Sequence, residues 1–351
     1  MINVGVIGLS ASGWASFRHA EALSNPAVQE HVKLVAVATS NAQSATAASE
    51  KYHVTAYGED GPAKLIKDPN VDLVVVAVKV PLHAAIIEQA IEEGKNIFSE
   101  WPLAPTVVEA EKLALAAKAK GIRTVVGLQT RYTPSILKVE ELIKANAIGR
   151  VLSSSAIITG DAWGPQTYGF ANEYMEDITA GATLTSVTAA HFLDAYVNIF
   201  GEFVSVSAQM KTQYPRVKSP TPEDAERFVL RTSEDQLLLH GETTKGVMSA
   251  FHFRGSIAQT GVQGFRWEIH GETGSILLTG AMGNAGAFAP DIFFNGEKVN
   301  LPKGELSNIG KEYLQYAFNN GSLDFDYAVL RHKMVQSIYE SAKTGKRTSY
   351  L

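Results

Sequence analysis

The sequence predicts a two-domain α/β protein: a doubly wound parallel sheet, then an α+β domain built on a large, mostly antiparallel sheet. Its 351 residues exceed what one hydrophobic core comfortably holds, which indicates two domains. Residues 1–130 alternate short β-branched runs with longer helical patterns, which is typical of parallel strands joined by crossover helices. This repeat stops after Pro134, so we expect domains at 1–130 and 131–351, with the C-terminal helix packing back near the first domain.

The elements of the first domain follow from apolar runs and helix-end signals. Strands are expected at 4–8, 34–38, 73–78, 96–98 and 124–128, and helices at 14–23, 42–52, 83–93 and 107–120. The run at 73–78 is almost wholly apolar, as expected of a strand buried on both faces. Gly94 and Gly121 follow two of the helices and predict their C-terminal ends.

The second domain begins with a helix from 134 to about 147. Strands are expected at 151–159, 203–210, 225–232, 236–241, 246–253 and 267–270, all in one largely antiparallel sheet. A helix at 180–200 lies between the first two strands, and a final helix covers 327–343.

Composition narrows the class of protein. Hydrophobic residues make up 45% and charged residues 19% of the chain, the balance of a globular protein rather than a disordered or membrane one. A net charge of −5 without blocks of like charge argues against direct nucleic-acid binding. The chain has no cysteine, which excludes disulfides and thiolate catalysis. The first residues enter a strand without a targeting leader, so we expect a cytoplasmic protein, or a nuclear one if it is a regulator.

A glycine motif joins the first expected strand to the first expected helix. Gly8, Ser10 and Gly13 have the spacing of Gly-x-Gly-x-x-Gly, with serine at the middle position. The first glycine permits a tight turn, the last lets helix and strand approach, and the helix N-terminus receives a pyrophosphate. The loop, which includes Ala11 and Ser12, therefore predicts a dinucleotide site on a Rossmann-type fold. A tight turn without a ligand is the alternative.

The end of the second expected strand bears on the choice of cofactor. NAD sites usually place Asp or Glu there to bind the ribose hydroxyls. This chain has Thr39, Ser40 and Asn41, which are neutral and do not repel a 2′-phosphate. We expect NADP at this corner, with NAD as the alternative.

Several stretches resemble the glucose-fructose oxidoreductase, inositol dehydrogenase and MocA family over nearly the whole chain. They are the glycine loop and its strand, 71–83, 100–104, 149–151, the helix of His191, 269–275 and 338–342. The residues at 8–10, 78–81, 100–101 and 128–129 are most similar to the branch of the yeast galactose-pathway repressor. The resemblance implies a homodimer formed through the antiparallel sheet and an NAD(P)-dependent oxidoreductase of a sugar, polyol or related carbonyl metabolite.

The chain departs from the family at two catalytic positions. The family has the motif Glu-Lys-Pro, and this chain has Trp101 in place of its lysine. An indole cannot transfer a proton to or from a hydroxyl, so the usual role of the lysine is not filled at this position. The family also places an Asp four residues before its catalytic His. Here His191 matches, but that position holds Val187. Asp194, one helical turn further on, is a candidate to orient the imidazole, with helix capping or a core hydrogen bond as the alternative.

Three residues are the catalytic candidates: His191, Lys79 and Glu100. Lys79 follows the strand at 73–78 at its carboxyl end, where ligands of open α/β sheets bind. Glu100 also ends a strand and is expected near the nicotinamide ribose or the substrate. The alternatives are a buried, hydrogen-bonded histidine and a solvated lysine.

The remaining candidates line the expected cofactor and substrate cleft. Trp101 offers a stacking face to a sugar or nicotinamide, with a packed interior as the alternative. The cofactor set also includes Val78, and the substrate set includes Gln129, Arg131, Tyr174 and a polar-aromatic loop with Asp161, Trp163 and Tyr168. His83 is expected to be a capping or packing residue. No motif predicts a metal site.

Three functions remain open. The first is an oxidoreductase in which His191, with Lys79, moves the proton and the cofactor takes the hydride. The second is a dinucleotide-binding regulator without catalysis, which acts through a protein partner; Trp101 and Val187 favour it. The third is an enzyme that uses the dinucleotide for redox-neutral chemistry on a small-molecule substrate.

Overall fold

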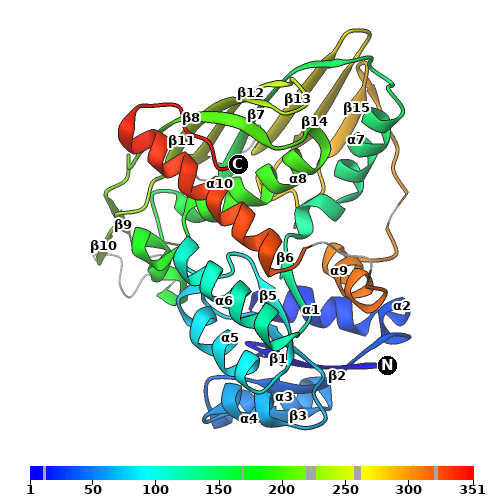
Figure 1. Ribbon diagram of the computed structural model, residues 1–351, viewed down its shortest axis with the longest axis vertical. Helices are drawn as coiled ribbons and strands as arrows, with labels where there is room; N and C mark the ends of the chain where they lie inside the picture. The colour runs from blue at the N-terminus through cyan, green and yellow to red at the C-terminus, as the bar shows by residue number, and fades with distance from the viewer. Residues whose placement is uncertain (11–12, 168–169, 219–226, 257–261, 303, 320–322) are drawn as a thin grey trace. The chain divides into compact units, whose positions relative to one another are not determined.

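The computed structural model describes residues 1–351 except 11–12, 168–169, 219–226, 257–261, 303 and 320–322. The chain divides into two compact units (Figure 1). The first unit comprises Met1–Gln129 and Gly304–Leu330, and the second comprises Thr130–Lys303 and Arg331–Leu351. Each unit therefore contains two separate segments of the chain.

The first unit is built on a six-stranded parallel sheet. Its strands are β1 (Ile2–Ile7), β2 (Val32–Ala38), β3 (Thr55–Tyr57), β4 (Leu73–Val76), β5 (Asn96–Glu100) and β6 (Thr124–Gly127). Their order is β3-β2-β1-β4-β5-β6, and all neighbours run parallel. The order reverses between β1 and β4, and ligands of doubly wound sheets bind at such a point. The expected fold class of this part is confirmed.

Helices follow the strands of this sheet. They are α1 (Trp14–Ser24), α2 (Pro26–Gln29), α3 (Ala42–Tyr52), α4 (Gly61–Lys67), η1 (Val80–Leu82), α5 (His83–Glu92), α6 (Val107–Lys120) and α9 (Asn308–Ala317). The predicted bounds of α3 and α6 match the structure because both helices have side-chain N-caps, Asn41 and Thr106. Helix α9, which packs against α1, was not predicted from the sequence.

The second unit is built on an eight-stranded sheet. Its strands are β7 (Val151–Gly160), β8 (Phe203–Lys211), β11 (Gln236–Thr243), β12 (Met248–Gly255), β13 (Phe265–Gly271), β14 (Ser275–Gly280), β15 (Asp291–Phe294) and β16 (Glu297–Lys298). The order is β16-β15-β14-β13-β7-β12-β11-β8. The sheet is antiparallel except where β7 and β12 run parallel, so the expected mostly antiparallel sheet is confirmed.

Helices α7 (Pro134–Lys144), α8 (Ala190–Phe200) and the second-unit part of α10 (Phe325–Thr344) supply core residues against this sheet. A group of aromatic rings lies within that core. The Phe192 ring lies 5.4 Å from the Phe251 ring and 5.2 Å from the Trp267 ring, both edge to face. Such packing fixes the rotation of α8, which carries His191.

Two expectations for this unit are wrong. Of the segment at 225–232 the structure describes 227–232, where Phe228–Leu230 form β10, which pairs with β9 (Arg216–Lys218) in a separate two-stranded sheet. The helix expected at 180–200 begins as the π-helical turn η6 (Leu184–Ala189), and only then continues as α8. Gly181 has a φ of 75° and ends the turn η5, and Thr183 makes a capping box with Ser186 at the start of η6. The helical structure is therefore interrupted between these two residues.

Short 3-10 turns complete the described elements. They are η2 (Gln129–Tyr132), η3 (Asp161–Trp163), η4 (Phe170–Glu176) and η5 (Ile178–Ala180). Three of them, η3 to η5, lie in the segment between β7 and η6.

Candidate functional site

The glycine loop lies at the point where the strand order reverses. Gly8 has a φ of 100°, and a Cβ there would lie 2.2 Å from the carbonyl oxygen of Ala77, at the end of β4. Only glycine fits this position. Gly13 has a φ of 103° and caps α1, but a Cβ there would meet no atom of the described residues within 4 Å. The expected packing role of Gly13 is therefore wrong, and its backbone conformation is what requires glycine. Ala11 and Ser12 lie outside the described residues.

A small polar cluster beside this loop was missed by the sequence analysis. The Tyr52 hydroxyl donates to the carbonyl oxygen of Ser10 at 2.9 Å and lies 2.8 Å from Oγ of Ser16. Nζ of Lys51 donates to the same Oγ at 3.0 Å. The cluster brings the last turn of α3 to the phosphate loop and places a cation there. The dinucleotide-binding motif does not extend to the end of α3, so this cluster could not be predicted from the sequence.

The corner after β2 holds Ser40 and Asn41, both exposed. The Asn41 side-chain oxygen accepts the backbone N–H of Ser44 at 2.8 Å and so caps α3. Ser44 Oγ donates to Thr39 Oγ1 at 2.9 Å. The exposed Ser40 Oγ accepts from Nδ2 of Asn41 at 3.3 Å, so the corner at 39–41 is a neutral, hydrogen-bonded turn.

The turns after β4 and β5 are tied together by His83. Its Nε2 lies 3.0 Å from the carbonyl oxygen of Val78, and its Nδ1 lies 2.9 Å from that of Pro102. Lys79 is exposed next to Val78. Trp101, by contrast, is buried with 4% of its surface exposed. The ring therefore lies in a packed interior here and does not present an open stacking face.

Glu100 ends β5 and is also buried. Its Oε1 lies 2.6 Å from Nε2 of His19 on α1. The other ring nitrogen of His19 lies 2.8 Å from the Tyr313 hydroxyl on α9. His19 and Tyr313 were not among the predicted site residues, because they are 81 and 213 positions away from Glu100 in the chain.

In the second unit, His191 lines a cavity of about 40 Å³. The lining residues are Thr130, Val187, Thr188, His191, Phe192, Phe265, Gly283, Asn284 and Ala285. Val187, at the position where the family has Asp, forms an apolar part of this wall. The imidazole thus shares its cavity with apolar side chains and with Thr130, Thr188 and Asn284.

Arg131 and Asp194 form a buried, two-point ion pair. Nε of Arg131 donates to Oδ2 at 2.9 Å, and Nη2 donates to Oδ1 at 2.6 Å. The Asp194 side chain is fully buried, and that of Arg131 is 10% exposed. The pair links η2 to α8, one turn beyond His191, so both residues orient that helix.

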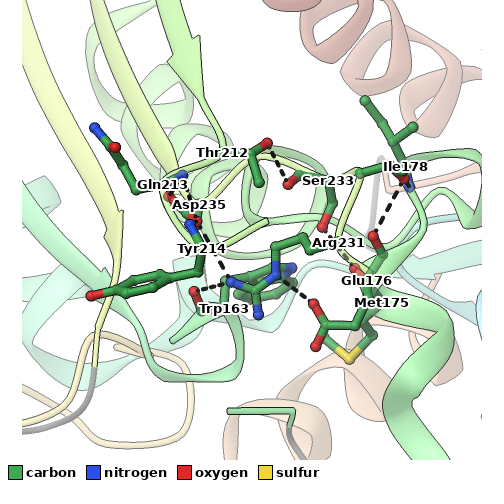
Figure 2. Close-up of polar contacts among 11 residues, drawn as sticks. Trp163, Met175, Glu176, Ile178, Thr212, Gln213, Tyr214, Arg231, Ser233 and Asp235 are labelled. Atoms are coloured by element: carbon green, nitrogen blue, oxygen red, sulfur yellow. Dashed lines mark hydrogen bonds and ion pairs between the residues drawn. The ribbon is translucent and has the colours of Figure 1, made fainter. Parts of the chain in front are cut away.

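A second buried ion pair, between Arg231 and Glu176, lies beside the backbone of Trp163 (Figure 2). Arg231 donates from Nε to Oε2 of Glu176 at 2.5 Å and from Nη1 to the carbonyl oxygen of Trp163 at 2.9 Å. Nη1 also lies 3.6 Å from Oδ2 of Asp235. Burial raises the pKa of Glu176, and the Arg231 guanidinium opposes that rise.

Backbone contacts add to this anchor. The Glu176 carbonyl oxygen accepts the N–H groups of Thr232 and Ser233. Tyr174 lies two residues before Glu176, and burial raises the pKa of its hydroxyl. Burial also raises the pKa of Asp161, while Tyr168 lies outside the described residues.

Two of the predicted substrate-binding residues have buried polar atoms whose hydrogen-bonding capacity is not satisfied by the described residues. Within the part of the chain that the structure describes, Oε1 of Gln129 and Nε1 of Trp163 are buried without a hydrogen-bond partner. Such atoms are costly unless water or a ligand binds them. Among the same residues, no group of three or more His, Asp or Glu side chains could hold a metal ion.

The parallel order of the first unit, with a glycine loop at its reversal point, defines a dinucleotide-binding α/β protein. Two family models match the chain. Residues 2–128 match the oxidoreductase family with an NAD-binding Rossmann fold, and residues 134–280 match the C-terminal domain of Gal80p.

Two dehydrogenases are among the relatives of this chain. Dehydrogenase aclE of Aspergillus oryzae is 31% identical over 99% of this chain and 98% of that protein. Levoglucosan dehydrogenase of Pseudarthrobacter phenanthrenivorans is 30% identical over 79% of this chain and 73% of that protein. The chain belongs to the glucose-fructose oxidoreductase, inositol dehydrogenase and MocA family, close to the Gal80 proteins, as the sequence motifs predicted.

Solved structures have the same fold. A super-repressor mutant of Gal80p from Saccharomyces cerevisiae superposes with a TM-score of 0.89 at 23% identity, covering 99% of this chain and 97% of that one. A levoglucosan dehydrogenase in complex with NADH and L-sorbose gives 0.80 at 22% identity, covering 100% and 99%. Among the described residues, no helix is long and apolar enough to cross a bilayer.

Proposed function

We propose that this protein is an NAD(P)-dependent oxidoreductase that acts on a sugar, a polyol or a related carbonyl metabolite. The observation that carries the proposal is the glycine loop at the reversal point of the parallel sheet, in a chain 31% identical along its length to a dehydrogenase. When bound, the nicotinamide supplies the hydride chemistry. The protein must then supply a base for the substrate hydroxyl and donors for its oxygens.

His191 is the proposed base. Its imidazole faces a small cavity, and a neutral imidazole can accept a hydroxyl proton. Lys79, exposed beside the turn after β4, is the proposed donor to the substrate oxygen in place of the lysine that the family has at position 101. Glu100 is proposed to act on the ribose side of the nicotinamide rather than on the reacting proton, because its carboxylate is held by His19.

The substrate-binding candidates divide by what their polar atoms contact. Gln129 and Trp163 have a buried acceptor and a buried donor without protein partners among the described residues, so we propose both as contacts to ligand hydroxyls, directly or through water. Tyr174 keeps its proton because of burial and adds a further donor. Arg131 and Trp101 are buried, and we propose positioning roles for them.

NADP is the proposed cofactor, with NAD as the alternative. The corner at 39–41 has no carboxylate, and the Ser40 hydroxyl is exposed there with a hydrogen to donate. Isothermal titration with NADP and NAD tests the choice, and tighter binding of NAD would reverse it. A Ser40→Asp variant should weaken NADP more than NAD, because the new carboxylate repels the 2′-phosphate.

The enzyme proposal is tested by turnover. Purified protein is assayed with both cofactors on a panel of sugars and polyols, and His191→Ala should lower kcat about a hundredfold or more. His240→Ala, at an exposed position on β11, is the matched control and should leave kcat unchanged. Dinucleotide binding combined with no turnover, or turnover indifferent to His191, would overturn the proposal.

A second candidate is a dinucleotide-binding regulator without catalysis. Trp101 and Val187 replace two catalytic groups of the family, and the second unit matches the Gal80p C-terminal domain. Dinucleotide-dependent capture of a protein partner by a protein without turnover would favour it. A redox-neutral enzyme is distinguished by product formation without net change in NAD(P)H absorbance.

We further propose a homodimer formed through the open face of the large sheet. Ile157 and Leu238 flank His252 on neighbouring strands, and Met248 lies on the same face. These three apolar side chains are 42%, 48% and 59% exposed, which is unusual for a sheet face left to solvent. Sedimentation of wild type and Ile157→Glu tests this, and an unchanged mass would refute it.

The proposed location is the cytoplasm, or the nucleus for a regulator.

A further inference from the structure

Glu100 ends β5 at the edge of the parallel sheet where dinucleotides bind, and its side chain is largely buried there. The residue is 9% exposed. Gly127, at the end of neighbouring β6, leaves room for it, because a Cβ there would lie 3.5 Å from both Cδ and Oε2. A carboxylate this deeply buried needs strong donors to stay ionised.

His19 supplies such a donor. It is completely buried on α1, and its Nε2 lies 2.6 Å from Oε1 of Glu100. The rings of Phe98 and Tyr313 pack against the imidazole at 5.6 and 5.9 Å between centroids, edge to face. The imidazole therefore has one fixed orientation, with Nε2 toward the carboxylate.

Tyr313 determines which nitrogen of His19 carries the proton. Its hydroxyl lies 2.8 Å from Nδ1, and burial together with the charge of Glu100 raises its pKa well above 10.0. The phenol therefore keeps its hydrogen. If it accepted a proton from His19, that hydrogen would have no other acceptor among the described residues, so the phenol donates to Nδ1. The Nε2–H tautomer of His19 then donates to Glu100.

This chain of hydrogen bonds joins the phosphate loop to the end of β5. Helix α1 begins at Trp14, directly after Gly13, and presents His19 about 7.5 Å along its axis from that start. The same rigid helix thus meets the dinucleotide loop at its N-terminus and Glu100 at its sixth residue. Any shift of α1 displaces the donor to Glu100.

We propose that His19, oriented by Tyr313, is a positioning residue that holds the Glu100 carboxylate in place for the ribose of the bound nicotinamide. The inference rests on the proposed function, since it assumes that a dinucleotide binds. His19 does not contact the reacting atoms in this arrangement. Its effect is on cofactor affinity, through the position and charge of Glu100.

The test is the dissociation constant for NADPH and NADH, measured by nicotinamide fluorescence. His19→Leu should weaken binding at least tenfold, which corresponds to about 1.4 kcal/mol. His19→Gln keeps an N–H donor at the Nε2 position and should restore affinity to within about threefold of wild type. The effect of His19→Leu should disappear in a Glu100→Gln background, because both variants remove the same interaction.

Two further measurements separate positioning from loss of structure. Phe203→Leu removes a fully buried ring from the core of the second unit and leaves the hydrogen bonds of His19 in place, so it should lower thermal stability without changing affinity. Histidine-selective ¹⁵N NMR should show His19 as the Nε2–H tautomer in wild type and lose that signature in Tyr313→Phe; it also covers the case in which His19→Leu does not fold.

Different results would refute the proposed oxidoreductase function and the positioning role of His19. Wild type that binds neither dinucleotide refutes the proposed function. The positioning role alone is overturned if wild type binds a dinucleotide and folded His19→Leu binds it equally well. It is also overturned if His19→Leu weakens binding by the same factor in wild type and in the Glu100→Gln background.

Discussion

The ion pair between Arg131 and Asp194 allows a quantitative test of how α8 is held. Arg131→Met removes the guanidinium and keeps an apolar side chain of similar length, leaving a fully buried carboxylate without its two-point partner. Breaking a buried pair in this way costs about 3–5 kcal/mol. Because domains are stable by only about 5–15 kcal/mol, this variant should lie near the limit of folding.

The matched control is Arg150, which pairs with Glu272 on the surface of the same unit. Their side chains are 68% and 47% exposed, so Arg150→Met should cost less than about 1 kcal/mol. The double variant Arg131→Met, Asp194→Leu should recover most of the stability, since both charges are gone.

The assay is urea unfolding followed by circular dichroism and tryptophan fluorescence, with Trp267 as a buried reporter in the second unit. The expected ranking of the free energy of unfolding is wild type, then Arg150→Met, then the double variant, with Arg131→Met far below. The reasoning is refuted if Arg131→Met costs no more than Arg150→Met. It is also refuted if the double variant is less stable than Arg131→Met.

Three further predictions concern stability. Gly8→Ala should destabilise by more than Gly13→Ala, for which a strained φ alone costs about 1–3 kcal/mol, because only at Gly8 does a Cβ meet backbone; equal losses in thermal unfolding would contradict this. Burial lowers the pKa of His332 from 6.5 to about 3, so the unfolded chain binds the proton first as pH falls. Stability should therefore be lost between pH 6.5 and 3 at about 1.4 kcal/mol per pH unit, and urea midpoints of His332→Gln at pH 7 and 5 should fall less steeply; parallel slopes would refute the cause. Tyr339→Phe removes a hydroxyl 3.0 Å from both oxygens of Glu234 and should cost about 1–3 kcal/mol, checked by calorimetry at pH 7, where an unchanged transition would show that the hydrogen bond contributes nothing.

Much of the fold could be predicted because its signals are local. Helix α6 has its cap at Thr106 and its stop at Gly121, and the predicted bounds are those of the structure. Strand β3 has only three residues, too few for a periodic pattern. Helix α9 is stabilised by packing against α1, which lies hundreds of residues earlier in the chain, so no local pattern indicated it.

The candidate site also contains residues that local motifs predict and residues whose partners are distant in the chain. The spacing of Gly8, Ser10 and Gly13 is visible in the sequence because a strand, a turn and a helix follow one another there. The partners of Arg131 and Glu100 lie 63 and 81 positions away, so only the fold shows that Arg131 is engaged with Asp194 and Glu100 with His19. Motif spacing thus locates a loop, but it does not give the protonation or burial of the groups around it.

The late segment Gly304–Leu330 has a consequence for how the protein is made. It supplies Tyr313 to the nucleotide-binding unit, so a ribosome that has released residues 1–129 has delivered all six strands of that sheet but not the phenol that orients His19. Domains commonly fold in the order of their synthesis. Here the N-terminal unit completes its interior only as translation nears its end, and a nascent chain stalled before α9 would hold a buried carboxylate and imidazole without their third partner.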